Sequence, residues 1–171
     1  MAYVGAAVTR REDARLLTGA GLYVADLQLV GMCELVFVRS QFACGRLSLD
    51  TSCALDMPEV LDVVSGRDVA AHLAPLPGMQ VTAPAGWSER VTHHIELPAQ
   101  PVLATDAVHY VGEPVAAIVA QTRNAALDAA ERVEQSVAET PPILDPVAAA
   151  EPGHARLHRG LGSNVMADMT V

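Results

Sequence analysis

The chain has 171 residues and a mass of 18.0 kDa, which is the size of one ordinary domain. Apolar residues make up 51% of the sequence, a fraction that excludes intrinsic disorder. The longest apolar run, residues 115–120, is far shorter than the ~20 residues that cross a membrane. We expect no secretory leader and a location in the cytoplasm.

The charge of the chain is acidic and unevenly placed. All eleven basic residues are arginines, against 20 acidic residues, so the formal net charge is −9. Residues 1–50 are balanced, and residues 51–171 carry the whole excess. Such a chain repels nucleic acid and anionic membranes, which makes both poor partners. The absence of lysine also excludes a P-loop nucleotide site.

The N-terminal part of the sequence predicts a short helix and then two strands. Thr9 and Glu12 have the spacing of a capping box, and Gly19 is a suitable left-handed residue to end the helix. Residues 32–40 are apolar at neighbouring as well as alternate positions, so we expect a central strand or one covered on both faces. Residues 46–50 alternate leucine with polar residues, which predicts a strand with one solvent-exposed face.

The middle of the chain predicts short elements followed by a long irregular segment. We expect a helical turn at residues 54–57, a third strand at 60–65 and a short helix at 69–73. Residues 74–100 contain repeated proline and glycine, which predicts a long loop. Trp87 in this loop either packs on the parent domain or anchors an interface.

The second half of the sequence predicts three strands and the longest helix. The expected strands are residues 102–104, 108–111 and 115–120, with a turn at 112–114 before the last of them. Thr122 is a suitable N-cap for a helix over residues 123–137. The buried stripe of this helix would comprise Ala126, Ala130, Val133 and Val137.

Strands and short helices are mixed along the chain, without an internal repeat, and this predicts the α+β fold class. We expect a single domain over residues 1–171, or two lobes divided by the loop at 74–100. After a short apolar stretch at 147–150, the remaining tail has the composition of coil.

The cysteines and one histidine pair are weak candidates for chemistry. Cys33, Cys44 and Cys53 form no Cys-x-x-Cys pair, so we expect reduced cysteines that serve as small apolar side chains. His154 and His158 have an i,i+4 spacing that would suit a metal ion on a helix. The glycines that flank this pair favour a solvated tail instead.

Two further candidates lie in predicted loops or turns. His93 and His94 are adjacent, and we expect them on a surface loop. Glu113, between a glycine and a proline, would be a catalytic acid if buried; the alternatives are a solvated carboxylate or one that caps a backbone amide. From the residues alone we assign no catalytic, cofactor-binding or metal-binding residue.

Four stretches of the sequence, taken together, resemble one protein family. They are residues 11–19 (Arg-Glu-Asp-Ala-Arg-Leu-Leu-Thr-Gly), 36–40 (Val-Phe-Val-Arg-Ser), 110–117 (Tyr-Val-Gly-Glu-Pro-Val-Ala-Ala) and 161–165 (Leu-Gly-Ser-Asn-Val). In this order they are similar to the N-terminal part of the molybdenum hydroxylase large subunits, the group of xanthine dehydrogenase, aldehyde oxidase and aerobic carbon monoxide dehydrogenase. The resemblance implies an α/β hammerhead domain, with mixed strands, short helices and one longer helix.

The resemblance also implies a function. The chain would be a non-catalytic domain or split fragment, inactive alone, of a molybdopterin-dependent hydroxylase or dehydrogenase acting on aldehydes, nitrogen heterocycles or carbon monoxide. The parent complex would hold molybdopterin, iron–sulfur clusters and FAD, none of them bound by this chain. The partners would be a molybdenum-cofactor domain or subunit, an iron–sulfur subunit and a flavin subunit, and we expect the molybdenum-cofactor domain to be absent here. The alternative is a free-standing binding or assembly module that keeps the fold.

Overall fold

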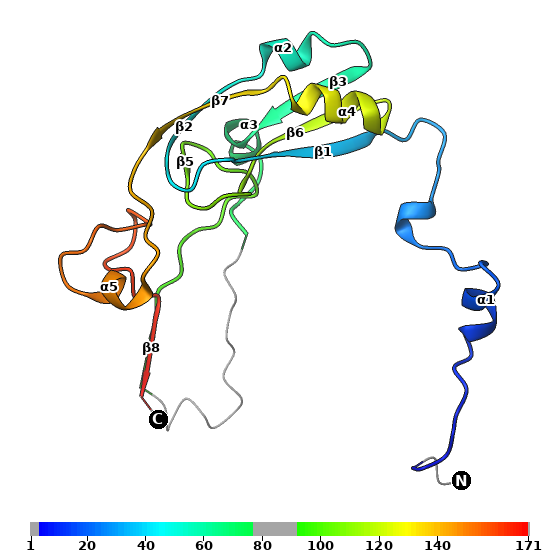
Figure 1. The fold of residues 1–171 in the computed structure, drawn as a ribbon, viewed down its shortest axis with the longest axis horizontal. Coiled ribbons are helices and arrows are strands. Elements are labelled where there is room, and N and C mark those ends of the chain that lie inside the picture. Colours follow the sequence, from blue (N-terminus) through cyan, green and yellow to red (C-terminus); the bar gives the residue numbers. More distant parts are fainter. Residues whose placement is uncertain (1–3, 77–91, 171) are drawn as a thin grey trace. The chain divides into compact units, whose positions relative to one another are not determined.

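The computed structural model describes residues 4–76 and 92–170, and the chain divides into two compact units. The first unit, Met1–Met32, contains the helix α1 (Asp13–Leu17) and the short 3-10 helix η1 (Val24–Asp26) (Figure 1). None of its described residues is buried. Residues 4–32 therefore form no hydrophobic core among themselves.

The predicted capping box at the start of α1 is wrong. Glu12 is the N-cap residue, and its carboxylate accepts a hydrogen bond from Arg15 at 2.6 Å instead of capping a backbone amide. Thr9 lies outside the helix. The φ angle of Gly19 is +72°, which confirms the predicted left-handed residue just beyond the helix.

The second unit, Cys33–Val171, contains two three-stranded antiparallel sheets. The first sheet has the order β1–β6–β3 and consists of β1 (Glu34–Arg39), β3 (Val60–Ser65) and β6 (Pro114–Ala120). Strand β6 lies in the centre, where Ile118 pairs with Val36 of β1 and with Val63 of β3. An apolar side chain at every position of β6 suits this place, and the predicted strand at 115–120 is confirmed.

Strand β1 is an edge strand, so the expectation of a central strand or one covered on both faces is wrong. Val38 is buried in the hydrophobic core, and Val36 is partly buried and packs against that core. Leu35 and Phe37 alternate with them and are 49% and 44% exposed. Because successive side chains of a strand point to opposite faces, one face of β1 packs in the core while the other is open in this chain.

The second sheet has the order β5–β2–β7 and consists of β2 (Gly45–Asp50), β5 (Ala107–Val108) and β7 (Glu134–Glu139). The prediction of one helix over residues 123–137 is therefore wrong, because helix α4 ends at Ala130 and the following residues form β7, with Val137 opposite Leu47. Val133 and Val137 are four residues apart, a spacing that fits one face of a helix and one face of a strand equally well.

Helix α4 (Arg123–Ala130) packs against β1 and β6 (Figure 1). Its buried residues are Ala126 and Ala129, whose small side chains let the helix approach the sheet closely. Ala130, which was predicted in the buried stripe, is only partly buried. The core cluster of the unit joins this helix face to the two sheets and includes Val38, Leu47, Val108, Val115, Ile118 and Val133.

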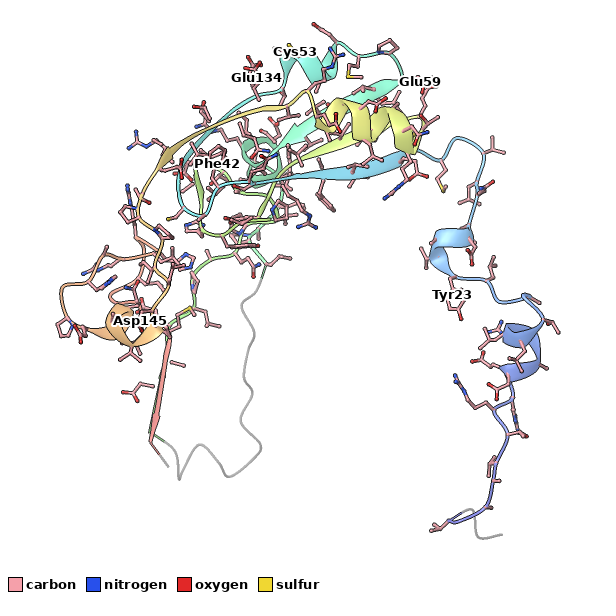
Figure 2. All side chains as sticks on the ribbon, in the orientation of Figure 1. Tyr23, Phe42, Cys53, Glu59, Glu134 and Asp145 are labelled. Atoms are coloured by element: carbon pink, nitrogen blue, oxygen red, sulfur yellow. The ribbon has the colours of Figure 1, made fainter. Side chains whose placement is uncertain are left out.

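The N-terminus of α4 is capped as the sequence predicts. The Thr122 hydroxyl accepts a hydrogen bond from the amide of Ala125 at 3.2 Å and donates one to the carboxylate of Glu59 at 3.0 Å. Glu59 itself has a φ of +68°, which places a non-glycine residue in the left-handed region beside the helix start (Figure 2). Its carbonyl also accepts a bond from the amide of Gln121 at 2.9 Å.

Two short helices begin earlier than predicted. They are α2 (Ser52–Leu55) and α3 (Gly66–Ala70), against predicted ranges of 54–57 and 69–73. Helix α3 begins early because Ser65 and Asp68 form a capping box, in which the amide of Ser65 donates to the Asp68 carboxylate at 2.9 Å. The hydrogen bonds from the Ser65 side chain and amide hold the pKa of Asp68 below its ordinary value of 3.8.

The strands predicted at 102–104 and 108–111 are mostly loop. Only Ala107–Val108 pairs, as β5. Ala104 is nevertheless buried, and its amide donates to the carbonyl of Pro114 at 2.8 Å, so this loop is part of the core without being a strand.

Of the remaining elements, β4 (Thr92–Ile95) and β8 (Ala167–Thr170) lie in segments that the sequence predicted as loop and coil, and α5 (Pro146–Ala150) coincides with the short apolar stretch noted at 147–150. Strand β4 pairs with β8, and α5 is capped by Asp145. The position of Trp87 is outside the described residues. Within those residues no helix is long and apolar enough to span a membrane. The mixture of antiparallel sheets and short helices confirms the α+β class.

Candidate functional site

Glu113 is a buried carboxylate in the turn that leads into β6. The residue is only 7% exposed, and Oε2 accepts a hydrogen bond from the backbone amide of His109 at 2.6 Å. The alternative of an amide-capping carboxylate is thus confirmed, and the alternative of a solvated carboxylate is wrong. The turn is fixed at the end of β1, since the amide of Ser40 donates to the Glu113 carbonyl at 2.9 Å and Gly112 donates to the Ser40 carbonyl at 2.8 Å.

The imidazoles of His109 and His158 stack beside Glu113. Their ring centroids are 4.7 Å apart and the rings are inclined by 26°. The Nδ1 atom of His109 lies 3.4 Å from Oε1 of Glu113, so the carboxylate contacts His109 through both of its oxygens. An acid and a histidine of the same turn are thereby brought together with His158, which comes from a distant part of the chain.

The surroundings of His158 favour its neutral form, because they lower the pKa of its imidazole. Burial lowers the pKa of His158 below its ordinary value of 6.5, the neighbouring His109 lowers it further, and Glu113 opposes both. Sequence reasoning placed His158 in a solvated tail and did not select His109. The available signal for His109 was its position four residues before an acid in a tight turn.

A helical metal pair of His154 and His158 does not form. Residues 151–166 contain turns and no helix, and Nδ1 of His154 lies 3.2 Å from the carbonyl of Ala155, while His158 stacks on His109. His93 and His94 lie on β4, not on the expected loop, and their side chains are outside the described part of the chain. Across residues 4–76 and 92–170, no group of three or more His, Cys, Asp and Glu side chains is placed to hold a metal ion.

The segment that carries His158 is held in shape by Asn164. The side chain of Asn164 accepts from the amide of Leu157 at 2.9 Å and donates to the carbonyls of Ala149 and Ala155 at 3.0 and 2.8 Å. A cavity of about 250 Å³ lies beside these hydrogen bonds. Its lining comprises Ile143, Leu144, Pro146, Ala149, Leu157, His158, Leu161, Ser163, Asn164 and Met166.

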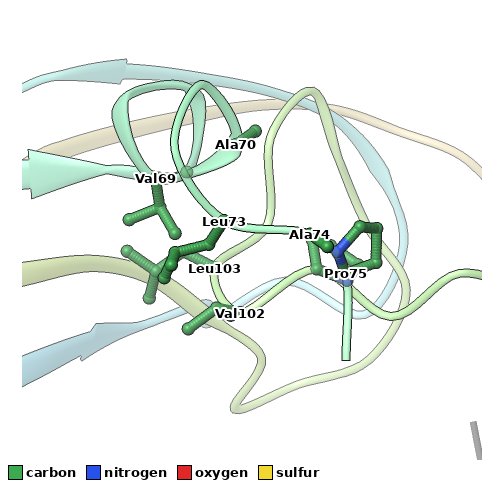
Figure 3. Close-up of a pocket in the computed structure, with 9 residues that line it drawn as sticks. Val69, Ala70, Leu73, Ala74, Pro75, Val102 and Leu103 are labelled. Atoms are coloured by element: carbon green, nitrogen blue, oxygen red, sulfur yellow. The ribbon is translucent and has the colours of Figure 1, made fainter. Parts of the chain in front are cut away.

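A second, smaller cavity of about 150 Å³ lies beneath α3 (Figure 3). Every residue that lines it is apolar or glycine, among them Val69, Leu73, Val102 and Leu103. Such a lining offers no side chain that could position or activate a reacting group. We therefore assign this cavity no chemical role.

None of the three cysteines, all of which lie in the described part of the chain, forms a disulfide, and only one of them is shielded from solvent. Cys33 and Cys53 are exposed, with Cys53 on α2 (Figure 2), so the expectation that the cysteines act as small buried side chains is wrong for both. Cys44 is partly buried, and its sulfur accepts a hydrogen bond from the Thr140 hydroxyl at 3.2 Å.

The sequence matches a known domain family over most of its length. Residues 18–140 match the family described as "Aldehyde oxidase and xanthine dehydrogenase, a/b hammerhead domain". The chain belongs to this family. The fold of this hammerhead domain is also that of a solved relative, quinoline 2-oxidoreductase from Pseudomonas putida 86, which aligns with a TM-score of 0.78 and 39% identity over 93% of this chain and 19% of that one.

The curated relatives of the hammerhead domain are much longer than it is. The nicotine 6-hydroxylase large subunit of Paenarthrobacter nicotinovorans is 39% identical over 84% of this chain, and the carbon monoxide dehydrogenase large chain of Afipia carboxidovorans is 38% identical over the same share. In both cases the chain spans 16% of the relative's length. A further relative, from Escherichia coli O157:H7, is named "Xanthine dehydrogenase molybdenum-binding subunit" and is 31% identical over 84% of this chain and 18% of its own length.

Among residues 4–76 and 92–170, no group of side chains is placed to hold a metal ion, and the N-terminus of α4 does not suit the phosphates of a pterin dinucleotide. The phosphates of such a cofactor need free backbone amides at a helix N-terminus or basic side chains. Helix α4, the longest described helix, already has its N-terminal amide at Ala125 bonded to Thr122. The sequence has no lysine, and the net charge of −9 disfavours an anionic group.

Proposed function

We propose that this chain is the hammerhead portion of a molybdopterin-dependent hydroxylase or dehydrogenase, in which it serves as a scaffold and not as the catalytic centre. The observation that carries the proposal is the family match over residues 18–140, combined with relatives of which the chain spans only 16%. The internal features are consistent with this role, because the buried acid Glu113 is used to fix a turn.

The substrate site and the redox partners would belong to other parts of the complex, outside this chain. The relatives are named for nicotine, carbon monoxide, xanthine, quinoline and aldehyde, which support a substrate among nitrogen heterocycles, aldehydes or carbon monoxide. Names such as "large subunit" and "large chain" support a multi-subunit complex. We propose that a molybdenum-cofactor domain or subunit, an iron–sulfur subunit and a flavin subunit complete it, and that molybdopterin, iron–sulfur clusters and FAD are bound there, in the cytoplasm.

A chimera tests the scaffold role directly. In the nicotine 6-hydroxylase large subunit, the matching segment is replaced by this chain, and the assembled complex is measured for molybdenum content and nicotine hydroxylation. We expect both to be retained, because a scaffold of the same fold supports the same cofactor domain. A soluble, assembled chimera without molybdenum or activity would contradict the proposal.

A matched variant controls for folding. In Gly66→Val, the new side chain would collide with the carbonyl of Ala104, so the domain should fail to fold and the chimera should fail to assemble. The isolated chain is measured in parallel, after expression in a host that makes the cofactor. We expect neither bound molybdenum nor dye reduction with aldehyde or purine substrates; stoichiometric molybdenum with turnover would refute the scaffold role.

A further inference from the structure

The stacked pair of His109 and His158 joins two parts of the second unit that are distant in sequence. His109 directly follows β5. The Glu113 carboxylate holds His109 in place, because it contacts both the backbone amide and the ring of His109. His158 lies in the turn-rich segment 151–166, which contains no helix or strand. Through the stack, this irregular segment contacts the turn between β5 and β6, residues 109–113, which is called the β5–β6 turn below.

The balance of charge at this contact changes with the protonation of the rings. Glu113 contacts His109 directly and offers one negative charge, which compensates one imidazolium. If both rings are protonated, two positive charges face each other across a stack of 4.7 Å and one of them has no counter-charge. The partial burial of the site strengthens this repulsion, because screening by water is weaker there.

We propose that His109, His158 and Glu113 form a pH-operated latch, which holds residues 151–166 on the β5–β6 turn when the rings are neutral and releases them when both are protonated. The other charged groups near His158 in the chain are Arg156 and Arg159, and the Arg156 guanidinium is engaged by the carbonyl of Leu161 at 3.2 Å. Both arginines add positive charge to the segment, so neither compensates a second imidazolium. This inference does not depend on the proposed function.

The direction of the pH effect follows from proton linkage. In the closed latch the pKa of His158 is below its ordinary value of 6.5, chiefly because of burial, whereas a released His158 regains the ordinary value. The closed form therefore binds fewer protons than the open form. As a result, the closed form has its full stability above pH 6.5 and loses stability as the pH falls below that value. For one proton, the ratio of open to closed molecules rises by up to about tenfold for each unit by which the pH falls.

Nuclear magnetic resonance of the full chain between pH 8 and pH 5 tests the latch. We expect the amide signals of residues 154–164 to move together to unstructured positions as the pH falls below 6.5, with the ring signals of His158 changing in the same range. The amides of β6 should stay unchanged. The latch is refuted if residues 154–164 do not respond to pH, or if they change only together with β6.

Three variants separate the latch from general acid unfolding. His158→Phe keeps an aromatic ring for the stack but cannot be protonated, so residues 154–164 should stay docked at pH 5. His154→Phe changes a histidine of the same segment outside the stack and should open like the unaltered chain. Glu113→Gln keeps an acceptor for the His109 amide but removes the counter-charge, so opening should move to higher pH. Opening of His158→Phe at the unaltered pH, or an unchanged midpoint in Glu113→Gln, would overturn the inference.

Discussion

Truncation of Ile118 to alanine tests where the core of the domain lies. Ile118 is fully buried at the centre of β6, between Val36 on one side and Val63 on the other. It belongs to the same core cluster as Ala126 and Ala129 of α4. Because both neighbouring strands are hydrogen-bonded to β6, the backbone has little freedom to close over a vacant space.

The expected loss of stability follows from the atoms removed and the space they leave. Ile118→Ala deletes three carbon atoms, which at ~0.8 kcal/mol each amounts to about 2.4 kcal/mol of lost transfer free energy. The alanines of α4 are too short to fill the space, so a cavity contribution is added. We expect a total of about 3–4 kcal/mol, in the middle of the ~2–5 kcal/mol range for such substitutions.

Urea denaturation followed by circular dichroism measures this loss. With a slope of about 2 kcal/mol per molar urea, the midpoint should fall by roughly 1.5–2 M while the slope stays the same. The matched control is Leu127→Ala, on the solvent side of α4 and 43% exposed, which should cost less than about 1 kcal/mol. A loss below about 1 kcal/mol for Ile118→Ala, or equal losses for both variants, would show that the core is misplaced.

Three further predictions concern the cap of α4 and the thiols. Thr122→Ala removes the acceptor for the amide of Ala125 and should lower the free energy of unfolding by about 1 kcal/mol, measured in the same urea assay; Thr122→Ser should restore most of it. Glu59→Gly relieves a left-handed non-glycine residue and should raise stability by up to about 1 kcal/mol, whereas a clear loss would show that its contact with Thr122 outweighs the strain. In native buffer Cys53 should react with a thiol reagent faster than Cys44, and equal rates would contradict their different exposure.

Some features of the candidate site were within reach of the sequence. The Gly-Glu-Pro turn identified Glu113, and one of the stated alternatives, an acid that caps a backbone amide, is the one found. His158 was out of reach, because it meets His109 only after the chain has folded. The i,i+4 spacing of His154 and His158 pointed to a helix that the flanking glycines do not support.

The sequence by itself determined the features that depend on neighbouring residues. These are the apolar strand β6, the Thr122 cap and the left-handed Gly19, and each is specified by side-chain periodicity or by a local hydrogen bond. The sequence also indicated the family, because four short motifs occur in the order that is typical of that family.

Tertiary structure alone decided how the segments pair. Strand β1 became an edge because β6, and not β1, lies between two partners. Residues 134–139 became a strand because they pair with β2, although Val133 and Val137 suited a helix as well. In both cases the local pattern is compatible with more than one arrangement, and contacts between distant segments select the arrangement that buries the most apolar surface.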